Sequence, residues 1–360
     1  MRHSPWRHWP AVLAKRRPIQ LTFFVTRRCN ARCAFCFYPG AGPAAAGQDT
    51  EFSLDEVRRT APTLGSLLWL AFSGGEPFVR GDLVELSRAF YDANRPALML
   101  YSTNGLLPER IADMAERILA HCRDTTVAIK VSLDGIGEEH DRLRGTPGGF
   151  ERALRTHRLL AGLRGRHANL EIGVNTVLLR ENQHRLDALL DFVRRLPGGG
   201  VHTISVARRS PRDAHCADID PAAYRHAAER LAGDLRARRA PTYRFAGARL
   251  KAAQDVVQRR LIHDTLVARR RQIPCYAGRL NLVLTERGEV FACEMSDASL
   301  GNVRDYGYDV RRLLRAPAAR AARRAIADDA CHCTHECYFI TNILFNPRLY
   351  PALAREYLRL

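Results

Sequence analysis

The stretch Ile19-Gln-Leu-Thr-Phe-Phe-Val25, followed closely by Cys29-Asn-Ala-Arg-Cys33-Ala-Phe-Cys36, decides the fold of this chain. The first part is apolar and reads as a strand, and the second places three cysteines just after its end. A cubane [4Fe–4S] cluster normally takes four cysteine ligands, so three thiolates leave one iron open to a small molecule. The motif therefore predicts an iron–sulfur site here, with zinc binding or reduced bystander thiols as the alternatives.

Downstream of the cysteines, short apolar runs alternate with amphipathic stretches of helix length. The expected strands are 67–72, 97–101, 126–133, 170–177 and 201–206, and the expected helices are 83–91, 107–121, 150–163 and 184–195. This alternation is typical of parallel β/α units, and the first strand brings their number to six. Ser53-Leu-Asp-Glu56 has the side chains of a capping box, which marks a helix start.

Small, polar or glycine-bearing segments follow the expected strands. They are Ser73-Gly-Gly-Glu-Pro77, Ser102-Thr-Asn-Gly105, Ser132-Leu-Asp-Gly135, Asn175-Thr176 and Arg208-Arg209. Loops at the carboxyl ends of parallel strands build the active sites of β/α barrels, so we expect these segments to converge with the cysteines on one face. Gly74 and Gly75 allow a backbone to approach a ligand closely, although a plain β-turn also explains them. Asn104-Gly105 is likewise compatible with turn chemistry alone.

The Cys-x3-Cys-x2-Cys spacing, with the aromatic Phe35 before the last cysteine, resembles the signature of the radical S-adenosylmethionine (SAM) superfamily. In that superfamily the open iron of a [4Fe–4S] cluster chelates the amino and carboxylate groups of SAM. The reduced cluster cleaves SAM to methionine and a 5'-deoxyadenosyl radical, which abstracts hydrogen from a substrate. The resemblance implies that Cys29, Cys33 and Cys36 bind this cluster. It also implies a reductant such as flavodoxin or ferredoxin as partner.

The resemblance also covers the strand ends. Gly-Gly-Glu-Pro after the second strand resembles the superfamily motif that holds the methionine amino group. Ser132 and Arg144 resemble a pair in the enzymes with a SPASM or twitch extension, where they can hydrogen-bond a carboxylate; alone, Arg144 reads as a surface arginine. No catalytic residue is assigned, and the implied SAM-binding residues are Gly74, Gly75, Glu76, Thr103, Asn104, Ser132, Arg144 and Asn175.

Five of the ten cysteines lie after residue 270. Residues 280–293 read as a β-hairpin that turns near Gly288. The cysteine pattern around it resembles the SPASM/twitch extension, whose cysteines bind auxiliary [4Fe–4S] clusters. Five thiolates cannot fully ligate two cubanes, so the resemblance implies one auxiliary cluster, with zinc as the alternative. Its firmest ligands are Cys275, Cys293 and Cys337, and the fourth is Cys331 or Cys333.

We therefore expect an α/β fold, namely a partial (β/α)6 TIM-like barrel with a small C-terminal cysteine-rich β-hairpin/helix module. The expected boundaries are a basic N-terminal segment (1–17), the radical SAM partial barrel (18–210), a helical connector (211–272), the auxiliary cluster module (273–345) and a C-terminal tail (346–360). At 360 residues, the chain is long enough to bury a barrel core and add a small module.

The amino-acid composition indicates the cellular compartment of the protein and the kinds of partner that it binds. Clustered cysteines that bind metal imply a reducing compartment, hence the cytoplasm, and no stretch approaches the roughly 20 apolar residues of a membrane span. The formal net charge is +18, carried almost entirely by arginine, with lysine only at positions 15, 130 and 251. That charge attracts anions, but no nucleic-acid-reading module accompanies it, so nucleic acid is not the expected partner.

Two classes of function remain. The first is a radical SAM oxidoreductase or maturase, with a peptide as the favoured substrate and a small molecule or sugar as the alternative. The second is a non-catalytic, metal-stabilised binding protein, which would have no need for a methionine site beside an open iron. Only about 18 residues precede the first strand, whereas a recognition domain needs about 50. A peptide substrate would therefore require a separate recognition protein or none.

Overall fold

The computed structural model describes residues 3–38, 40–42, 51–208, 210–295, 298–328 and 331–360. Within these residues one sheet of nine strands runs in the order β6-β5-β4-β3-β2-β1-β7-β8-β9. Its six parallel barrel strands are β1 (Gln20–Thr26), β2 (Trp69–Gly74), β3 (Leu98–Thr103), β4 (Thr126–Ser132), β5 (Leu170–Leu178) and β6 (Val201–Val206). The predicted α/β partial barrel is confirmed, and strand ends differ from the expected ones by at most two residues.

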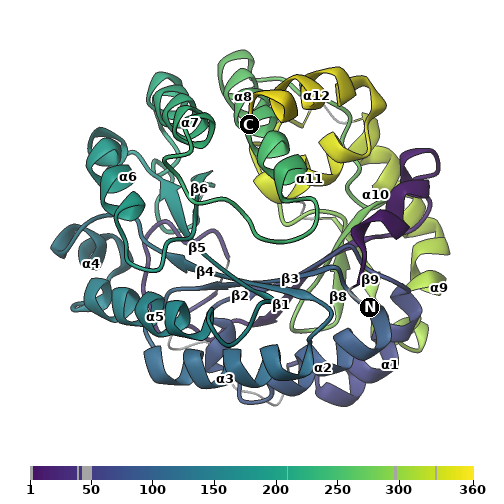
Figure 1. The fold of residues 1–360 in the computed structure, drawn as a ribbon. Helices are drawn as coiled ribbons and strands as arrows, with labels where there is room; N and C mark the ends of the chain where they lie inside the picture. Colours follow the sequence, from purple (N-terminus) through teal and green to yellow (C-terminus); the bar gives the residue numbers. More distant parts are fainter. Residues whose placement is uncertain (1–2, 39, 43–50, 209, 296–297, 329–330) are drawn as a thin grey trace.

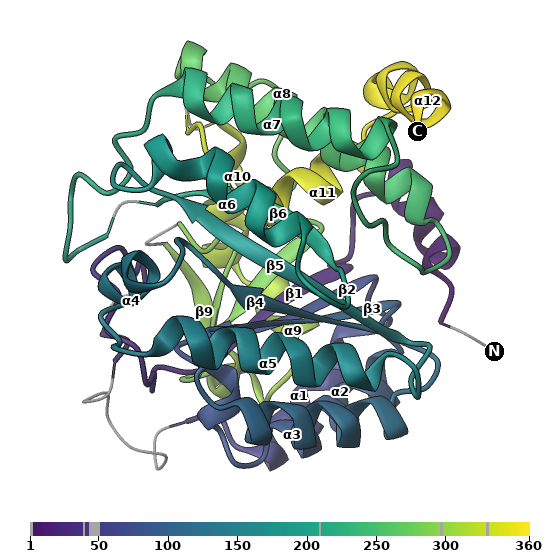
Figure 2. The same cartoon turned by 60° about the vertical axis from the view of Figure 1, so that its left-hand side comes forward.

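Helices cover the sheet on two sides, as Figure 1 shows. On the outer face lie α1 (Leu54–Leu64), α2 (Leu83–Asn94), α3 (Pro108–His121), α5 (Gly149–Leu163) and α6 (Leu186–Arg194), whereas α4 (Glu138–Arg144) lies at the carboxyl ends of the strands. Facing the inner side of the curved sheet are α7 (Pro221–Arg236), α8 (Ala248–Ala268), α11 (Glu336–Leu344) and α12 (Tyr350–Arg359). The open barrel is therefore closed by helices from the C-terminal half, which Figure 2 shows from another side.

Shorter elements complete the chain. The β9 edge of the sheet is followed by α9 (Val310–Arg315) and α10 (Pro317–Asp328). The 3-10 helices are η1 (Pro5–Val12), η3 (Pro77–Val79), η4 (Gln183–Arg185), η5 (Val303–Tyr306) and η6 (Pro347–Leu349). In the part of the chain that is described, no helix has the combination of length and apolar character that a bilayer crossing requires.

Local sequence explains the helix starts and the hairpin. Ser53 Oγ accepts a hydrogen bond from the Glu56 amide, and the Glu56 carboxylate accepts one from the Ser53 amide, so the capping box before α1 is confirmed. The predicted hairpin consists of β7 (Asn281–Leu284) and β8 (Glu289–Phe291), and Gly288 turns it with a φ of 80°. A residue with a side chain is strained at that φ, which is why glycine marks the turn.

The β7–β8 hairpin belongs to the same sheet as the barrel strands. Strand β7 pairs in parallel with β1, Gln20 opposite Asn281, while β8 and β9 (Ser299–Asn302) continue the sheet in antiparallel pairing. One continuous sheet thus crosses the predicted boundary between 18–210 and 273–345. The domain boundaries stay predictions, but this pairing fixes the C-terminal cysteines at the edge of the barrel.

The core lies between the sheet and its outer helices. Phe23, Phe72, Phe90 and Tyr101 are fully buried there and pack ring against ring. The inner face of the same strands carries smaller side chains, such as Ala71 on β2. Small residues such as Ala71 and Ala128 leave space inside the barrel, although Trp69 and Leu98 also face inward.

Candidate functional site

A cavity of about 310 Å³ lies on the inner face of the sheet and reaches the carboxyl ends of the strands. Residues predicted from five different strand ends meet on its wall, together with one predicted ligand from the C-terminal module. They are Cys29, Cys33, Cys36, Gly74, Gly75, Glu76, Thr103, Asn104, Ser132, Arg144, Asn175 and Cys337. Arg208 also lines the cavity, whereas Arg209 lies outside the described residues. The predicted convergence of the first five strand ends is thus present in the structure.

The three-cysteine loop is fixed by hydrogen bonds from distant parts of the chain. Ser210 Oγ donates to the carbonyls of Ala34 (2.7 Å) and Cys36 (2.9 Å). Asn104 Nδ2 donates to Asn30 Oδ1 at 2.7 Å and lies 3.7 Å from the sulfur of Cys29. The loop therefore depends on the ends of β3 and β6, so its thiols are positioned before any cofactor binds.

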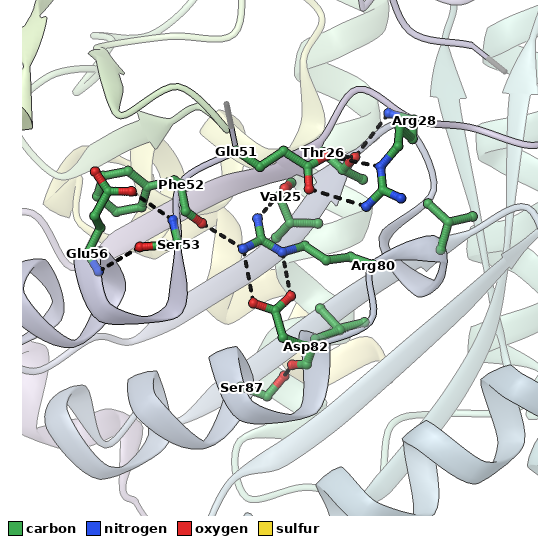
Figure 3. A network of polar contacts seen from close by, with 12 residues as sticks. Val25, Thr26, Arg28, Glu51, Phe52, Ser53, Glu56, Arg80, Asp82 and Ser87 are labelled. Carbon is green, nitrogen blue, oxygen red and sulfur yellow. Dashed lines mark hydrogen bonds and ion pairs between the residues drawn. The ribbon is translucent and has the colours of Figure 1, made fainter. Parts of the chain in front are cut away.

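Figure 3 shows further contacts at the end of β1, which leads into this loop. Buried Arg80 donates to the carbonyls of Val25 and Phe52, both at 2.6 Å, and forms an ion pair with Asp82 (2.7 Å). Nearby, Arg28 donates twice to Glu51 at 3.2 Å. Sequence analysis did not single out Arg80, because nothing in the sequence links it to β1.

The two glycines after β2 serve the packing of this loop. A Cβ on Gly74 would lie 2.4 Å from the Thr26 carbonyl oxygen, and one on Gly75 would lie 2.2 Å from the Arg28 carbonyl oxygen. The amide of Gly75 also donates to the Thr26 carbonyl at 2.7 Å. No side chain fits between these backbones, so the glycines hold the Gly-Gly-Glu segment against the chain that enters the cysteine loop.

Glu76 binds the loop after β3. Its carboxylate accepts hydrogen bonds from Thr103 Oγ1 (2.8 Å), the Asn104 amide (2.7 Å) and the Phe78 amide (3.2 Å). Burial raises the pKa of Glu76 to about 7. The Thr103 hydroxyl and the Glu76 carboxylate are therefore hydrogen-bonded to each other. The backbone atoms of these two residues remain as the candidate contacts with SAM.

Arg144 is held at the cavity wall by a buried carboxylate. Its Nε and Nη2 both lie 2.6 Å from Asp134 Oδ2, and Asp134 is fully buried. The second oxygen of Asp134 accepts a hydrogen bond from the Val177 amide at 2.8 Å. Asp134 lies inside the Ser-Leu-Asp-Gly motif, but its partner could not be read from the sequence.

Ser132 and Asn175 lie side by side on β4 and β5, as register partners on the same wall. Asn175 Oδ1 accepts hydrogen bonds from Thr203 (2.9 Å) and Ser205 (3.1 Å). These bonds orient the Asn175 side chain, and its amide N–H groups donate to no residue that the structure describes.

The C-terminal cysteines form a second group. Burial raises the pKa of Cys275, Cys293 and Cys333, and the negative charges of neighbouring thiolates, including that of Cys331, add to this effect. Burial thus raises the pKa of Cys293 to about 12 and that of Cys333 to about 11. Mutual repulsion of this kind requires proximity, and the four residues are Cys275, Cys293, Cys331 and Cys333.

Cys337 differs from the other four because it lines the large cavity. Its sulfur and one ligand atom each of Glu294 and His335 all lie within 4.8 Å of one another. Arg208 pairs with Glu294 at 2.7 Å, and His335 Nε2 lies 2.9 Å from the same carboxylate. The charges of His335 and Arg208 lower the pKa of Glu294 to about 2, against the effect of burial. The assignment of Cys337 as a cluster ligand stays a prediction.

The donor sets fit iron–sulfur clusters. Three thiols on one preorganised loop face a cavity that offers space for a ligand of the fourth iron. Burial raises the pKa of Cys29 to about 12, so metal binding there must displace protons. In the C-terminal group the soft thiolates match iron–sulfur clusters and also zinc.

Comparison with known proteins agrees with this geometry. The family model described as the radical SAM superfamily matches residues 23–193, which include the cysteine loop and β1 to β5. Residues 23–193 therefore form a radical SAM domain. A [4Fe–4S] cluster and SAM are characteristic of enzymes with this domain.

Two curated relatives illustrate the range of the superfamily. An AdoMet-dependent heme synthase from Nitratidesulfovibrio vulgaris is 30% identical over 213 residues, 55% of this chain and 51% of that protein. A PqqA peptide cyclase from Rhizobium meliloti is 30% identical over 190 residues, 52% of this chain and 47% of the relative. The chain thus spans about half the length of these relatives.

A solved structure shares the fold over nearly the whole chain. Native anSMEcpe with bound AdoMet and the Cp18Cys peptide has a TM-score of 0.58 and 15% identity, and covers 95% of this chain and 99% of that one. The similarity extends beyond the barrel into the region of the C-terminal cysteines.

The glycine packing gives a first prediction. We expect Gly75→Ala to lower the iron bound by the cysteine loop severely, because the new Cβ would collide with the Arg28 backbone, which cannot move aside as a side chain can. Gly81→Ala is the control, since nothing lies within 4 Å of its Cβ position. Iron analysis of both variants after anaerobic reconstitution tests this, and equal iron contents would contradict it.

Proposed function

We propose that this protein reductively cleaves SAM and uses the 5'-deoxyadenosyl radical to abstract hydrogen from a peptide substrate, with an auxiliary [4Fe–4S] cluster that assists oxidation or cross-linking. One observation carries the proposal: the three-cysteine loop, the Gly-Gly-Glu segment and Arg144 line the same cavity as Cys337. A peptide substrate is supported by similarity to a peptide cyclase. The heme synthase relative keeps a small molecule as the second candidate.

In this proposal each group of residues has a separate task. The thiolates of Cys29, Cys33 and Cys36 hold a [4Fe–4S] cluster, which supplies the electron that cleaves SAM. The Gly74–Glu76 backbone receives the methionine amino group, and Arg144, oriented by Asp134, neutralises the methionine carboxylate. Ser132 and the amide of Asn175 donate hydrogen bonds to the remaining oxygens.

The C-terminal group provides the second cofactor site. Four thiolates can complete the ligation of one cubane cluster, and five cysteines are present in this region. Full ligation favours electron transfer over direct binding of the substrate, so we propose an oxidised or cross-linked product. The β7–β1 pairing supports this role, because it holds the module against the barrel that contains the cavity.

The decisive experiment needs no substrate. Dithionite-reduced, anaerobically reconstituted protein is expected to release 5'-deoxyadenosine and methionine slowly from SAM, as chromatography would detect. Protein without dithionite is the control, because cleavage requires an electron. Release no greater than in that control would overturn the radical assignment for this chain and favour the metal-stabilised binding protein.

A further inference from the structure

Two cations on the cavity wall, Lys130 and Arg259, make no direct ion pair with any residue that the structure describes. Arg259 of α8 is 7% exposed, and its side chain makes no hydrogen bond or ion pair with any residue that the structure describes. Lys130 of β4 has a single hydrogen bond, to Thr203 Oγ1 at 3.1 Å, and no ion pair within the described ranges. Buried lysines and arginines are almost always paired, so this arrangement calls for an anion from outside the chain.

The other charged residues on the cavity wall already have hydrogen-bond or ion-pair partners. Asp255 forms its ion pair with Lys251 and accepts a hydrogen bond from Tyr243 at 3.0 Å. The charges of Arg259 and Lys130 also act on this carboxylate, so one negative charge faces three cations. Glu171 accepts from the Arg244 amide, and Glu336 accepts from the Val206 amide. The remaining basic groups on the wall have partners as well: Arg144 with Asp134, Arg208 with Glu294, and Arg212 with the carbonyls of Cys33 and Ala41.

The strand register shows how far into the barrel Lys130 lies. Lys130 lies two residues before Ser132 on β4, so both line the cavity and Lys130 lies about 7 Å further into the barrel. Its register neighbours are Ser102 on β3 and Gly173 on β5, of which only Ser102 has a side chain. Burial and the charge of Lys251 lower the pKa of Lys130 to about 8, although the charge of Asp255 acts in the opposite direction.

The residues around Lys130 and Arg259 indicate what kind of molecule carries the anionic group. Ala71, Leu100 and Ala128 form an apolar patch on the adjoining wall, and Ile340 of α11 faces the same cavity. The chain has only three lysines, yet Lys130 and Lys251 both line this cavity. An apolar patch beside two cations without an ion pair suits an organic body with one anionic group.

We propose that Lys130 and Arg259 bind a carboxylate or phosphate group of the substrate inside the barrel, below the proposed SAM site. The inference rests on the proposed function, because it concerns the substrate of that same cavity. In a peptide, an acidic side chain or the terminal carboxylate supplies the group. The anion fixes the substrate from below, so that its reactive carbon is presented towards the carboxyl ends of the strands.

Binding of simple probes to the reconstituted protein tests this site without turnover. Hexanoate, hexyl phosphate and neutral hexanol share one alkyl body and differ in their head group. We expect isothermal titration to detect binding of one or both anions and none of hexanol. The preferred anion identifies the substrate group as carboxylate or phosphate, whereas equal binding of hexanol would overturn the proposal.

Substitutions of Lys130 and Arg259, with one control variant, show where the anionic probe binds. Lys130→Met and Arg259→Met are each expected to weaken anion binding about tenfold or more, because each removes a charge-assisted hydrogen bond. Both variants should keep or raise the thermal stability of the unliganded protein, because each removes an unpaired cation. Arg158→Met, on the exposed side of α5, should change neither property. Anion binding that is unaltered in both cavity variants would overturn the assignment.

The outcomes separate this inference from the proposed function. Protein that binds an anionic probe through Lys130 and Arg259 but releases no 5'-deoxyadenosine from SAM would support the anion site and overturn the radical reaction. Protein that cleaves SAM but binds neither anion would support the reaction and overturn the anion site.

Discussion

The triple variant Cys29→Ala, Cys33→Ala, Cys36→Ala is expected to lose about half of the bound iron and all release of 5'-deoxyadenosine. Two cubane clusters amount to roughly eight irons per chain, and removal of one leaves about four. The loss is confined to one site because the C-terminal cysteines are carried by other elements, around the β7–β8 hairpin and before α11. Iron and sulfide analysis with chromatography of the nucleoside measures both effects.

Cys122→Ala is the matched control for this experiment. Cys122 is a fully buried thiol that follows α3 in the core and does not line the cavity. It should therefore keep the iron of the unaltered protein and release 5'-deoxyadenosine at an unchanged rate. A triple variant that retains all its iron would contradict the first cluster site. About four irons together with stoichiometric zinc in the unaltered protein would contradict the auxiliary cluster.

Asp134→Ala is expected to cause the largest loss of stability and of SAM affinity among single changes at the cavity wall. It leaves the guanidinium of Arg144 without its buried counter-ion and the Val177 amide without its acceptor. Removal of one partner from a buried ion pair costs about 3–5 kcal/mol. Thermal unfolding of the variant and equilibrium binding of SAM measure the two effects.

Two further variants separate stability from binding. Asp55→Ala removes a carboxylate whose side chain is 86% exposed, so it should cost little. Asp134→Ala combined with Arg144→Met should recover much of the stability, because no unpaired charge remains, yet it should not recover SAM affinity. If Asp134→Ala costs no more than Asp55→Ala, the pair does not stabilise the site. If the double variant binds SAM normally, the role given to Arg144 is wrong.

The sequence alone determined the elements of this protein. Apolar runs of strand length, helix-length amphipathic stretches and the capping box at Ser53 are local patterns, and local backbone preferences fix the structures they form. The cysteine spacing and the Gly-Gly-Glu segment are also contiguous, so the sequence indicated both the cluster loop and the strand ends that surround it. These residues do line one cavity.

Tertiary structure alone decided the contacts between distant segments. The pairing of β7 with β1, the hydrogen bonds of Arg80 beneath the cysteine loop, and the meeting of Lys130 with Arg259 join residues that no sequence pattern connects. Such contacts depend on the packing of whole elements, and one basic residue among so many arginines carries no signal of its own. The open inner face of the barrel selects which of these charges meet, because only side chains directed into it can reach a common ligand.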